Sequence, residues 1–387
     1  MHRTARPILL APFALYMGLT GTALAKEVEL PRTMAWSAYG TNSSGYTQAV
    51  AIGAMLQKNY GTALRILPGE NDVSRMTPLK GGRVDICACG IAAYFGAEGV
   101  LMFATPDWGP QPLRVITTSI ASFSMSPAVA GDLGVKTPAD LKGRKISYIR
   151  GDDALNKGTE AYLAFGGLTW DDVERVDFPG YGRSFDGIIA GQSDAAFTST
   201  VTPVAQQLAS SPRGITWPTL APDDQEGWAR MQKVAPYFQP HVMTSGAGGV
   251  SQDNPVDSAS YPYPIIVSNA DFENDTAYSL IKALQDGHAD YKDAAPGAAG
   301  YAMDKQNMTW VIPFHDAVVE YYKEKGVWTD AMQAHQDQLV KRQNLLIDTW
   351  KRFTDSNPPQ DEAAFSQAWM TTRADALRQA GLDPVFE

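Results

Sequence analysis

Short runs of apolar residues alternate along the chain with segments whose apolar residues recur every three or four positions. The short runs predict strands and the periodic segments predict helices. The predicted strands are 33–39, 64–67, 84–89, 113–118, 145–149, 173–178, 194–197 and 265–268. The predicted helices are 46–59, 73–80, 156–165, 184–190, 225–234, 275–286, 328–353 and 362–380. This alternation is typical of an α/β fold.

The order of these elements predicts two α/β halves, the second inserted into the first. We expect lobe I to comprise residues 26–129 and 263–345, lobe II residues 130–262, and a C-terminal helical extension residues 346–387. Thr137 and Pro138 mark a helix start within lobe II. Much of 215–262 is rich in Gly, Pro and Ser and is expected to be irregular.

The first 25 residues have the pattern of a cleavable secretory signal. Arg3 and Arg6 precede a mostly apolar run, and Ala23 and Ala25 form the small-x-small pattern that signal peptidase accepts. The alternative is a membrane anchor, but the run is shorter than the roughly 20 apolar residues that span a bilayer. We therefore expect a mature protein that acts outside the cytoplasm.

Composition narrows the possible partners. The net charge is −10 and the sequence contains no basic block, so we expect no binding to nucleic acid or to an anionic membrane surface. An anionic ligand would need a local cationic pocket. The only cysteines, Cys87 and Cys89, are too few for a zinc site. Because residues i and i+2 of an extended strand lie too far apart to bridge easily, we expect buried thiols rather than a disulfide.

Loops that follow predicted strands and open helices are the candidate ligand sites, because ligands of open α/β sheets bind beyond the carboxyl ends of strands. Three such loops carry hydroxyl or amide side chains: 39–46, 151–159 and 198–200. Such side chains and free backbone N–H groups suit a carboxylate, although the same residues could simply cap helices.

Arginine side chains near these loops could bind a carboxylate through two parallel hydrogen bonds. The candidates are Arg75, Arg150 and Arg183. For each of them, a surface salt bridge is the alternative interpretation.

Motifs of catalysis are lacking. The sequence has no Gly-x-Ser-x-Gly, no His-Glu-x-x-His and no phosphate-binding loop. Ser279 and Lys282 match Ser-x-x-Lys only by letter, without the partner motifs. We expect a protein that is not an enzyme and needs no cofactor or metal.

Several segments, in order, resemble those of the TAXI family of TRAP-transporter solute receptors, over nearly the whole of the expected mature chain. They are Ser44-Gly-Tyr46, Leu79-Lys-Gly-Gly-Arg-Val-Asp85, Asp140-Leu-Lys-Gly-Arg-Lys-Ile-Ser147 with Lys157-Gly-Thr-Glu160, Gly191-Gln-Ser-Asp-Ala195, and Ile312-Pro-Phe-His-Asp-Ala317 with Tyr321-Tyr-Lys-Glu-Lys-Gly326. The resemblance implies a type II periplasmic-binding-protein-like α/β fold, with two lobes that close on a ligand between them. It makes His315, within the last motif, a structural histidine.

The resemblance also implies a function. We expect a monomeric periplasmic receptor that captures a small carboxylate or amino acid, such as glutamate, and delivers it to inner-membrane TRAP permease subunits. A sensor subunit or a periplasmic enzyme on the same fold are the alternatives. The expected ligand-binding residues are Tyr39, Thr41, Asn42, Ser44, Gly45, Tyr46, Arg75, Arg150, Lys157, Gly158, Thr159, Thr198 and Thr200.

The chain departs from the family pattern at positions that bear on the ligand. Arg75 stands where the family has an uncharged polar residue, and Thr41-Asn-Ser-Ser44 replaces a loop richer in glycine. The turn between Ile149 and Lys157 is longer than usual and carries two acids. These departures suggest a pocket with charges of both signs, as an amino acid or another zwitterion would require.

Overall fold

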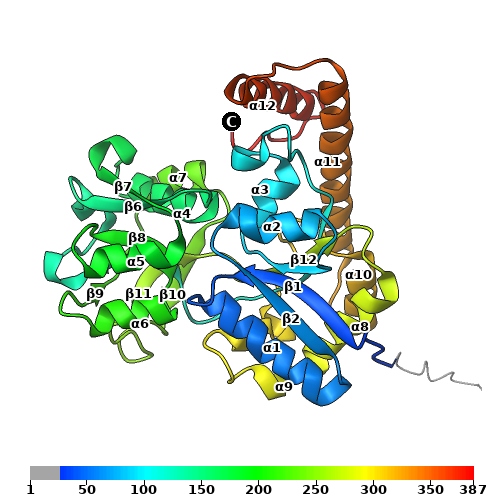
Figure 1. Ribbon diagram of the computed structural model, residues 1–387, viewed down its shortest axis with the longest axis horizontal. Helices are drawn as coiled ribbons and strands as arrows, with labels where there is room; N and C mark the ends of the chain where they lie inside the picture. Colours follow the sequence, from blue (N-terminus) through cyan, green and yellow to red (C-terminus); the bar gives the residue numbers. More distant parts are fainter. Residues whose placement is uncertain (1–26) are drawn as a thin grey trace, which may run out of the picture.

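Two five-stranded sheets form the framework of the computed structural model, which describes residues 27–387. The predicted signal segment lies outside the described residues. Figure 1 shows one lobe, largely blue with cyan and yellow parts, beside a second lobe in green. None of the described helices is both long and apolar enough to cross a membrane.

The sheet of lobe I has the strand order β2-β1-β3-β12-β4. Strands β1, β2 and β3 run parallel, and β12 is antiparallel to both β3 and β4. The strands are β1 (Thr33–Tyr39), β2 (Ala63–Gly69), β3 (Ile86–Ala88), β4 (Leu113–Thr118) and β12 (Ile265–Asn269). Since β12 comes late in the chain, lobe I is discontinuous in sequence.

The sheet of lobe II repeats this arrangement with the order β7-β6-β8-β5-β9. Again the first strand of a parallel set lies between the second and the third, and an antiparallel strand follows. The strands are β5 (Met125–Ala130), β6 (Lys145–Ile149), β7 (Glu174–Phe178), β8 (Ala195–Ser199) and β9 (Ile215–Thr216). Two lobes of this kind, with crossings between β4 and β5 and between β11 and β12, confirm the predicted fold class.

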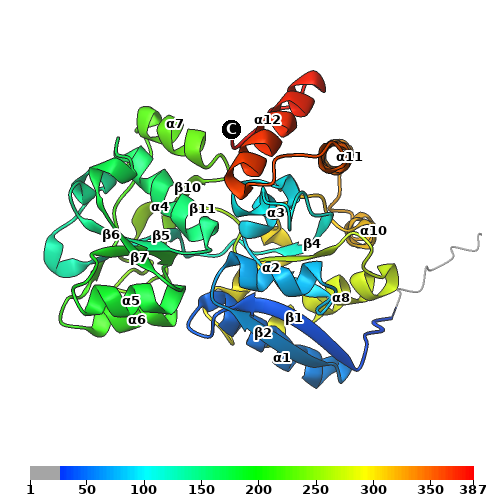
Figure 2. The same cartoon turned by 45° about the horizontal axis from the view of Figure 1, so that its top comes forward.

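Helices cover both sheets, and a hairpin lies where the lobes meet (Figures 1 and 2). The hairpin is β10 (Gln239–Met243) with β11 (Val256–Ser260). The α-helices are α1 (Ser44–Tyr60), α2 (Asp72–Lys80), α3 (Ala92–Glu98), α4 (Asp153–Phe165), α5 (Tyr181–Ile189), α6 (Pro203–Ser210), α7 (Gln225–Val234), α8 (Asn274–Asp286), α9 (His288–Tyr291), α10 (Asp316–Glu324), α11 (Asp330–Asp355) and α12 (Glu362–Gln379). The 3₁₀ turns are η1 (Leu101–Phe103), η2 (Gly131–Leu133), η3 (Pro138–Leu141), η4 (Trp170–Asp172), η5 (Ala298–Tyr301) and η6 (Met303–Lys305).

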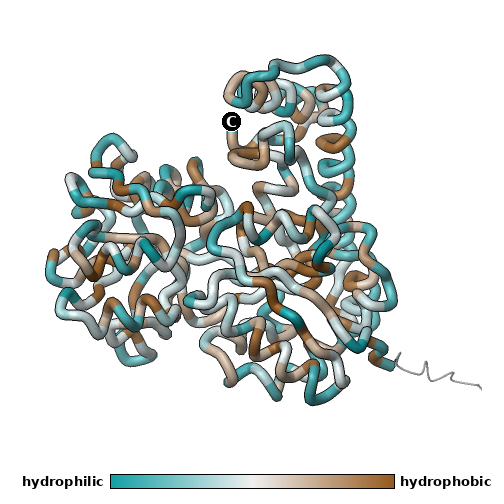
Figure 3. Tube along the Cα trace, viewed as in Figure 1, coloured by the Kyte–Doolittle hydropathy of each residue, from teal (hydrophilic) through white to brown (hydrophobic). Residues whose placement is uncertain are grey.

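The largest hydrophobic core continues from lobe I into lobe II. It joins lobe I residues such as Trp36 and Phe95 to Tyr162 and Phe197 of lobe II, and it includes Tyr237, which lies just before β10. Figure 3 shows hydrophobic segments inside both lobes, whereas the long helix α11 is mostly hydrophilic in colour. The lobes are thus in contact through apolar as well as polar groups.

The expectation of free thiols was wrong, because Cys87 and Cys89 form a disulfide. Cys87 lies in strand β3 and Cys89 directly follows its end, and the two Cα atoms lie 5.2 Å apart. That separation lies within the range that a disulfide spans. Both residues are buried, as predicted.

Candidate functional site

The first loop of lobe I, between β1 and α1, presents hydroxyl groups to lobe II. Ser43 caps α1: its Oγ accepts a hydrogen bond from Tyr46 N at 3.1 Å and donates one to Gly40 O at 2.8 Å. Ser44 is buried, and its Oγ donates to Ser199 Oγ of lobe II at 3.0 Å. The loop is thereby fixed in shape and already bonded across the lobes.

The second loop of lobe I, between β2 and α2, places an arginine inside the protein. Asn71 and Ser74 form a capping box at the start of α2, which leaves Asp72 in the first turn. One turn on, Arg75 is only 3% exposed and forms an ion pair with Asp72. The centre of its guanidinium lies 4.2 Å from the centroid of the Tyr39 ring, a cation–π distance.

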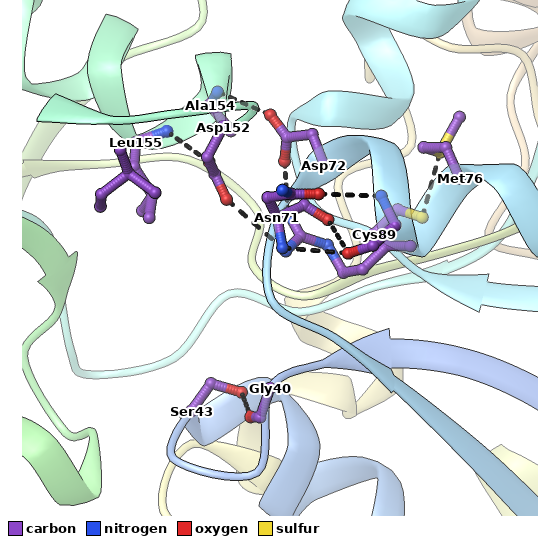
Figure 4. Close-up of polar contacts among 12 residues, drawn as sticks. Gly40, Ser43, Asn71, Asp72, Met76, Cys89, Asp152, Ala154 and Leu155 are labelled. Atoms are coloured by element: carbon purple, nitrogen blue, oxygen red, sulfur yellow. Dashed lines mark hydrogen bonds and ion pairs between the residues drawn. The ribbon is translucent and has the colours of Figure 1, made fainter. Parts of the chain in front are cut away.

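Lobe II meets this arginine with the start of α4. Asp152 caps that helix, accepting a hydrogen bond from Leu155 N at 3.0 Å. Its other oxygen, Oδ2, lies 3.7 Å from Arg75 Nη1. Figure 4 shows Asp152 and Asp72 close together where the two lobes meet, with the Ser43–Gly40 bond separate from them.

Backbone groups tie the same region together. Asp72 N donates to Gly151 O at 3.1 Å, and Asp72 Oδ2 accepts from Ala154 N at 2.8 Å. A further bond joins Met102 N of lobe I to Asp153 Oδ2 of lobe II at 2.8 Å. The structure therefore has its lobes closed on each other.

A small cavity remains between the closed lobes, lined by side chains from both lobes and from the return crossing that leads to β12. Its volume is about 30 Å³, far below the roughly 300 Å³ or more of typical ligand pockets. The lining residues are Tyr39, Gly40, Ser43, Gly69, Glu70, Arg75, Ile91, Met125, Asp152, Ala154, Leu155, Tyr181, Thr198, Ser199, Tyr261 and Tyr263. A ligand of several heavy atoms fits only if the lobes separate.

The charged groups beside this cavity are strongly perturbed by burial. Burial, reinforced by the charge of Asp152, raises the pKa of Asp72 well above its usual value, against the effect of Arg75. Burial also raises the pKa of Asp152 to about 6. For Arg75, burial acts to lower the pKa, but the two carboxylates outweigh it and the net shift is upward. Perturbed groups of this kind in a cleft are typical of functional sites.

Two buried polar atoms at the cavity have no hydrogen-bond partner among the described residues. They are Arg75 Nε, a donor, and Asp152 Oδ2, an acceptor. Leaving such groups unpaired costs about 1–3 kcal/mol each. Both residues line the cavity, so a bound molecule could satisfy both atoms at once.

Among the sequence-predicted site residues, the structure brings Tyr39, Arg75 and Thr198 together at the cavity. Gly45 packs against the Tyr39 ring, since a Cβ at this glycine would lie 2.4 Å from a ring carbon. Ser44 bonds to Ser199, which lines the cavity.

The other predicted residues lie elsewhere or act locally. Thr41 and Asn42 are exposed, and Tyr46 is half-buried. Arg150 is 69% exposed and pairs with Asp177. Lys157 pairs with Glu160, while Thr159 Oγ1 and Thr200 Oγ1 donate to the carbonyls of Leu155 and Ser245. Gly158 packs against Phe197.

Sequence reasoning missed most of the tyrosines and both carboxylates beside Arg75. Asp152 had been noted only as an acid in a long turn. Tyr181 opens α5 and bonds through its hydroxyl to Thr198 Oγ1 at 2.5 Å. Tyr261 and Tyr263 belong to the return crossing, within or just after the segment expected to be irregular. Their signal was a run of aromatic residues and prolines, Tyr261-Pro-Tyr-Pro264.

Two further expectations concern histidine and metals. His315 is buried and caps α10, its Nδ1 accepting from Ala317 N at 3.3 Å while Nε2 lies 3.0 Å from Phe272 O. These contacts give His315 a structural role. Within residues 27–387, no three His, Cys, Asp or Glu side chains are grouped as a metal site.

Comparison with family models gives one match, to the NMT1-like family, over residues 39–326. The chain belongs to this family. The matched region contains the sheet of lobe II, the sheet of lobe I except most of β1, and the residues that line the cavity. Comparison with curated proteins gives no match.

Several solved structures are similar to this NMT1-like chain. The alkanesulfonate-binding protein SsuA from Xanthomonas axonopodis pv. citri, bound to MOPS, is 15% identical, with 82% of this chain and 95% of that chain covered and a TM-score of 0.42. An ancestral arginine-binding protein bound to arginine is 13% identical, with 69% and 97% covered and a TM-score of 0.43. A protein from Bordetella bronchiseptica RB50 is 16% identical, with 92% and 93% covered and a TM-score of 0.44.

Proposed function

We propose that this protein is a solute-binding receptor that captures one small ligand between its lobes outside the cytoplasm. The observation that carries the proposal is a buried cavity to which both lobes contribute polar groups, two of which lack partners. A cavity of about 30 Å³ cannot admit an organic molecule unless the lobes open. Capture by opening and closing of two lobes is hinge closure around a ligand.

The ligand of this receptor is a small amino acid or organic acid. Arg75 Nε is a buried, unpaired donor that a carboxylate oxygen would satisfy. The Ser199 hydroxyl lines the same cavity and, because it accepts from Ser44 Oγ, keeps its own proton as a further donor. All three expected loops, 39–46, 151–159 and 198–200, contribute to this lining.

The receptor's partner is an inner-membrane TRAP permease, to which it delivers the ligand in the periplasm. This part of the proposal depends on the TAXI-like motifs, and on the predicted signal at residues 1–25 for the location. Co-purification of the protein with TRAP permease subunits, dependent on ligand, would support it. A stable complex with a receptor kinase instead would favour a sensor role.

Ligand binding is tested by heating the purified protein with panels of amino acids and organic acids. A ligand that binds only the folded state raises its stability by RT ln(1 + [L]/Kd). Arg75→Ala should weaken the stabilisation by a ligand that carries a carboxylate, whereas Arg150→Ala should preserve it, because Arg150 is largely exposed. Equal effects of the two variants would contradict the assignment of the site. Conversion of a ligand to product would identify an enzyme.

A further inference from the structure

The charged groups at the cavity are unbalanced. Three carboxylates, Glu70, Asp72 and Asp152, either line it or pair with Arg75, which is the one basic residue in its lining. Glu70 is exposed at the rim, and no described basic group lies within 4 Å of it. Carboxyl groups therefore outnumber basic groups around this cleft.

Arg75 cannot offset that excess for an incoming anion, because its guanidinium is already occupied. Nη2 is bonded to Asp72, Nη1 faces Asp152, and the Tyr39 ring lies over its face. Only Nε remains unpaired. A carboxylate grips arginine strongly through two parallel N–H groups, and no such pair is left, so an anion gains a single hydrogen bond.

Asp152 offers the opposite opportunity. Its side chain is 1% exposed, and Oδ2 has no hydrogen-bond partner, since 3.7 Å to Arg75 Nη1 is too long for one. A buried carboxylate oxygen without a donor is costly, and its pKa is raised to about 6 in spite of Arg75. A cation placed in the cavity would add a second positive charge to that of Arg75, and an N–H group on it would supply the donor that Oδ2 lacks.

Aromatic rings surround the same space. Tyr39, Tyr181, Tyr261 and Tyr263 all line the cavity, and the rings of Tyr39 and Tyr263 lie 5.1 Å apart. Rings of this type attract cations to their faces. Arg75 already occupies one face of Tyr39, which shows that a positive group is accommodated in this surrounding.

We propose that the ligand carries a positively charged nitrogen, bound by Asp152 Oδ2 among the tyrosine rings, with Glu70 at the rim attracting it. The proposal rests on the proposed receptor function and narrows its ligand class. Zwitterionic or basic amino acids and amines bind, and dicarboxylates without an amino group do not. A carboxylate of an amino acid can use Arg75 Nε at the same time.

The test uses two probe panels and the full mature protein. L-arginine, L-lysine, L-glutamine, putrescine and choline form the cationic or zwitterionic panel; glutarate, 2-oxoglutarate and succinate form the anionic one. We expect calorimetry to show binding in the first panel alone. Tighter binding of a dicarboxylate overturns this inference but leaves the receptor function intact. If neither panel binds, and no small molecule is released when the protein is denatured, the receptor function fails as well.

Two variants make the test specific. Asp152→Asn removes the charge and keeps a good helix cap, so the fold should persist while affinity for the cationic ligand falls at least ten-fold. Asp186→Asn makes the same chemical change at an exposed position on α5 and should leave affinity unchanged. Unchanged affinity in Asp152→Asn would overturn the proposal.

Proton exchange gives an independent readout. A bound cation favours ionised Asp152, so binding near pH 6 should release protons, as calorimetry in buffers of different ionisation enthalpy would show. An anionic ligand would instead cause proton uptake, and uptake would contradict the proposal. Asp152→Asn should abolish most of the exchange.

Discussion

Two buried clusters of charged side chains in this protein have similar compositions but differ in how many of their polar atoms are hydrogen-bonded. In the first, Arg75 lies between Asp72 and Asp152, and two polar atoms lack partners. In the second, Glu98 lies between Arg342 and Arg373.

The second cluster is saturated with hydrogen bonds. Both Glu98 oxygens accept from Arg342, at 2.6 and 2.8 Å, and one also bonds to Arg373. The remaining arginine donors reach backbone carbonyls, including Glu98 O at the C-terminal end of α3 and Asp383 O, Pro384 O and Val385 O of the C-terminal tail. This cluster clamps α11, α12 and the tail onto lobe I.

The comparison teaches how a buried charge cluster that stabilises a fold differs from one that awaits a ligand. The two differ little in burial, since Arg75 is 3% exposed and Arg373 0%. They differ in unpaired atoms and in where those atoms lie, because the first cluster borders a cavity. The following predictions test whether this difference has the consequences we assign to it.

The largest effect is expected from Glu98→Gln. The substitution leaves two buried guanidinium groups without a counter-charge, and breaking a buried pair typically costs about 3–5 kcal/mol of unfolding free energy. Chemical denaturation measures the loss. Glu226→Gln, at a 92% exposed position, should change stability by less than about 1 kcal/mol.

In this variant, ligand affinity per folded molecule should stay unchanged, because the clamp does not touch the cavity. Reduced affinity in folded Glu98→Gln would mean that the clamp contributes to the site and that the two clusters are not separate in function.

A somewhat smaller effect is expected from Arg75→Met. Removal of the guanidinium leaves Asp72 and Asp152 buried without their cation, at a cost of about 2–4 kcal/mol near pH 7. The loss should shrink toward pH 5, because carboxylates can take up protons, whereas the arginines left by Glu98→Gln cannot lose theirs. Denaturation of both variants at pH 5 and pH 7 makes the comparison, with Arg150→Met as the exposed control.

The fold was largely predictable from the sequence because most of its elements carry a clear pattern. Strands 33–39, 113–118 and 145–149 and helix 225–234 have the bounds predicted for them. Two of the missed elements, β5 and α3, lack a pattern. All six residues of β5 are buried, as are all seven of α3, so neither has polar positions that would reveal a period. The hairpin β10–β11 is short and contains Pro240.

The site was predictable only where it follows local rules. Tyr39 ends β1 and Arg75 lies in the helix after β2, so the rule for ligands beyond parallel strands finds them. Tyr261 and Tyr263 reach the cavity only because the return crossing passes between the lobes, which no local pattern expresses. Likewise, the ion pair between Arg75 and Asp152 forms only when the lobes are closed.

The stability of the wild-type protein should depend on pH differently from that of Asp152→Asn. In the folded protein, the pKa of Asp152 is raised to about 6 from its usual 3.8, so between these values the folded state holds a proton that the unfolded state has released. Its contribution to stability is therefore fully present below about pH 4 and is lost as the pH rises through 6.

Near pH 7, Asp152→Asn should accordingly be more stable than the ligand-free wild-type protein by about 1–3 kcal/mol, with the difference vanishing toward pH 4. The charges that face Asp152, from Asp72, Arg75 and Asp153, are common to both proteins. Denaturation midpoints across pH 4–7 measure the difference. A constant difference would show that Asp152 titrates normally.

The smallest effect is expected from Ser44→Ala, which removes the hydrogen bond between Ser44 and Ser199 across the lobes. The lost bond is neutral and the Ser199 hydroxyl can find another partner, so the cost should be about 0.5–1.5 kcal/mol. Because the bond exists only when the lobes are closed, its loss should appear as a shift toward the open form, measured by small-angle scattering of the ligand-free protein. Thr77→Ala is a suitable control, since its hydroxyl bonds only within α2. If Ser44→Ala opened the protein fully, this one bond would hold the lobes closed, and the charge cluster at Arg75 would contribute little to closure.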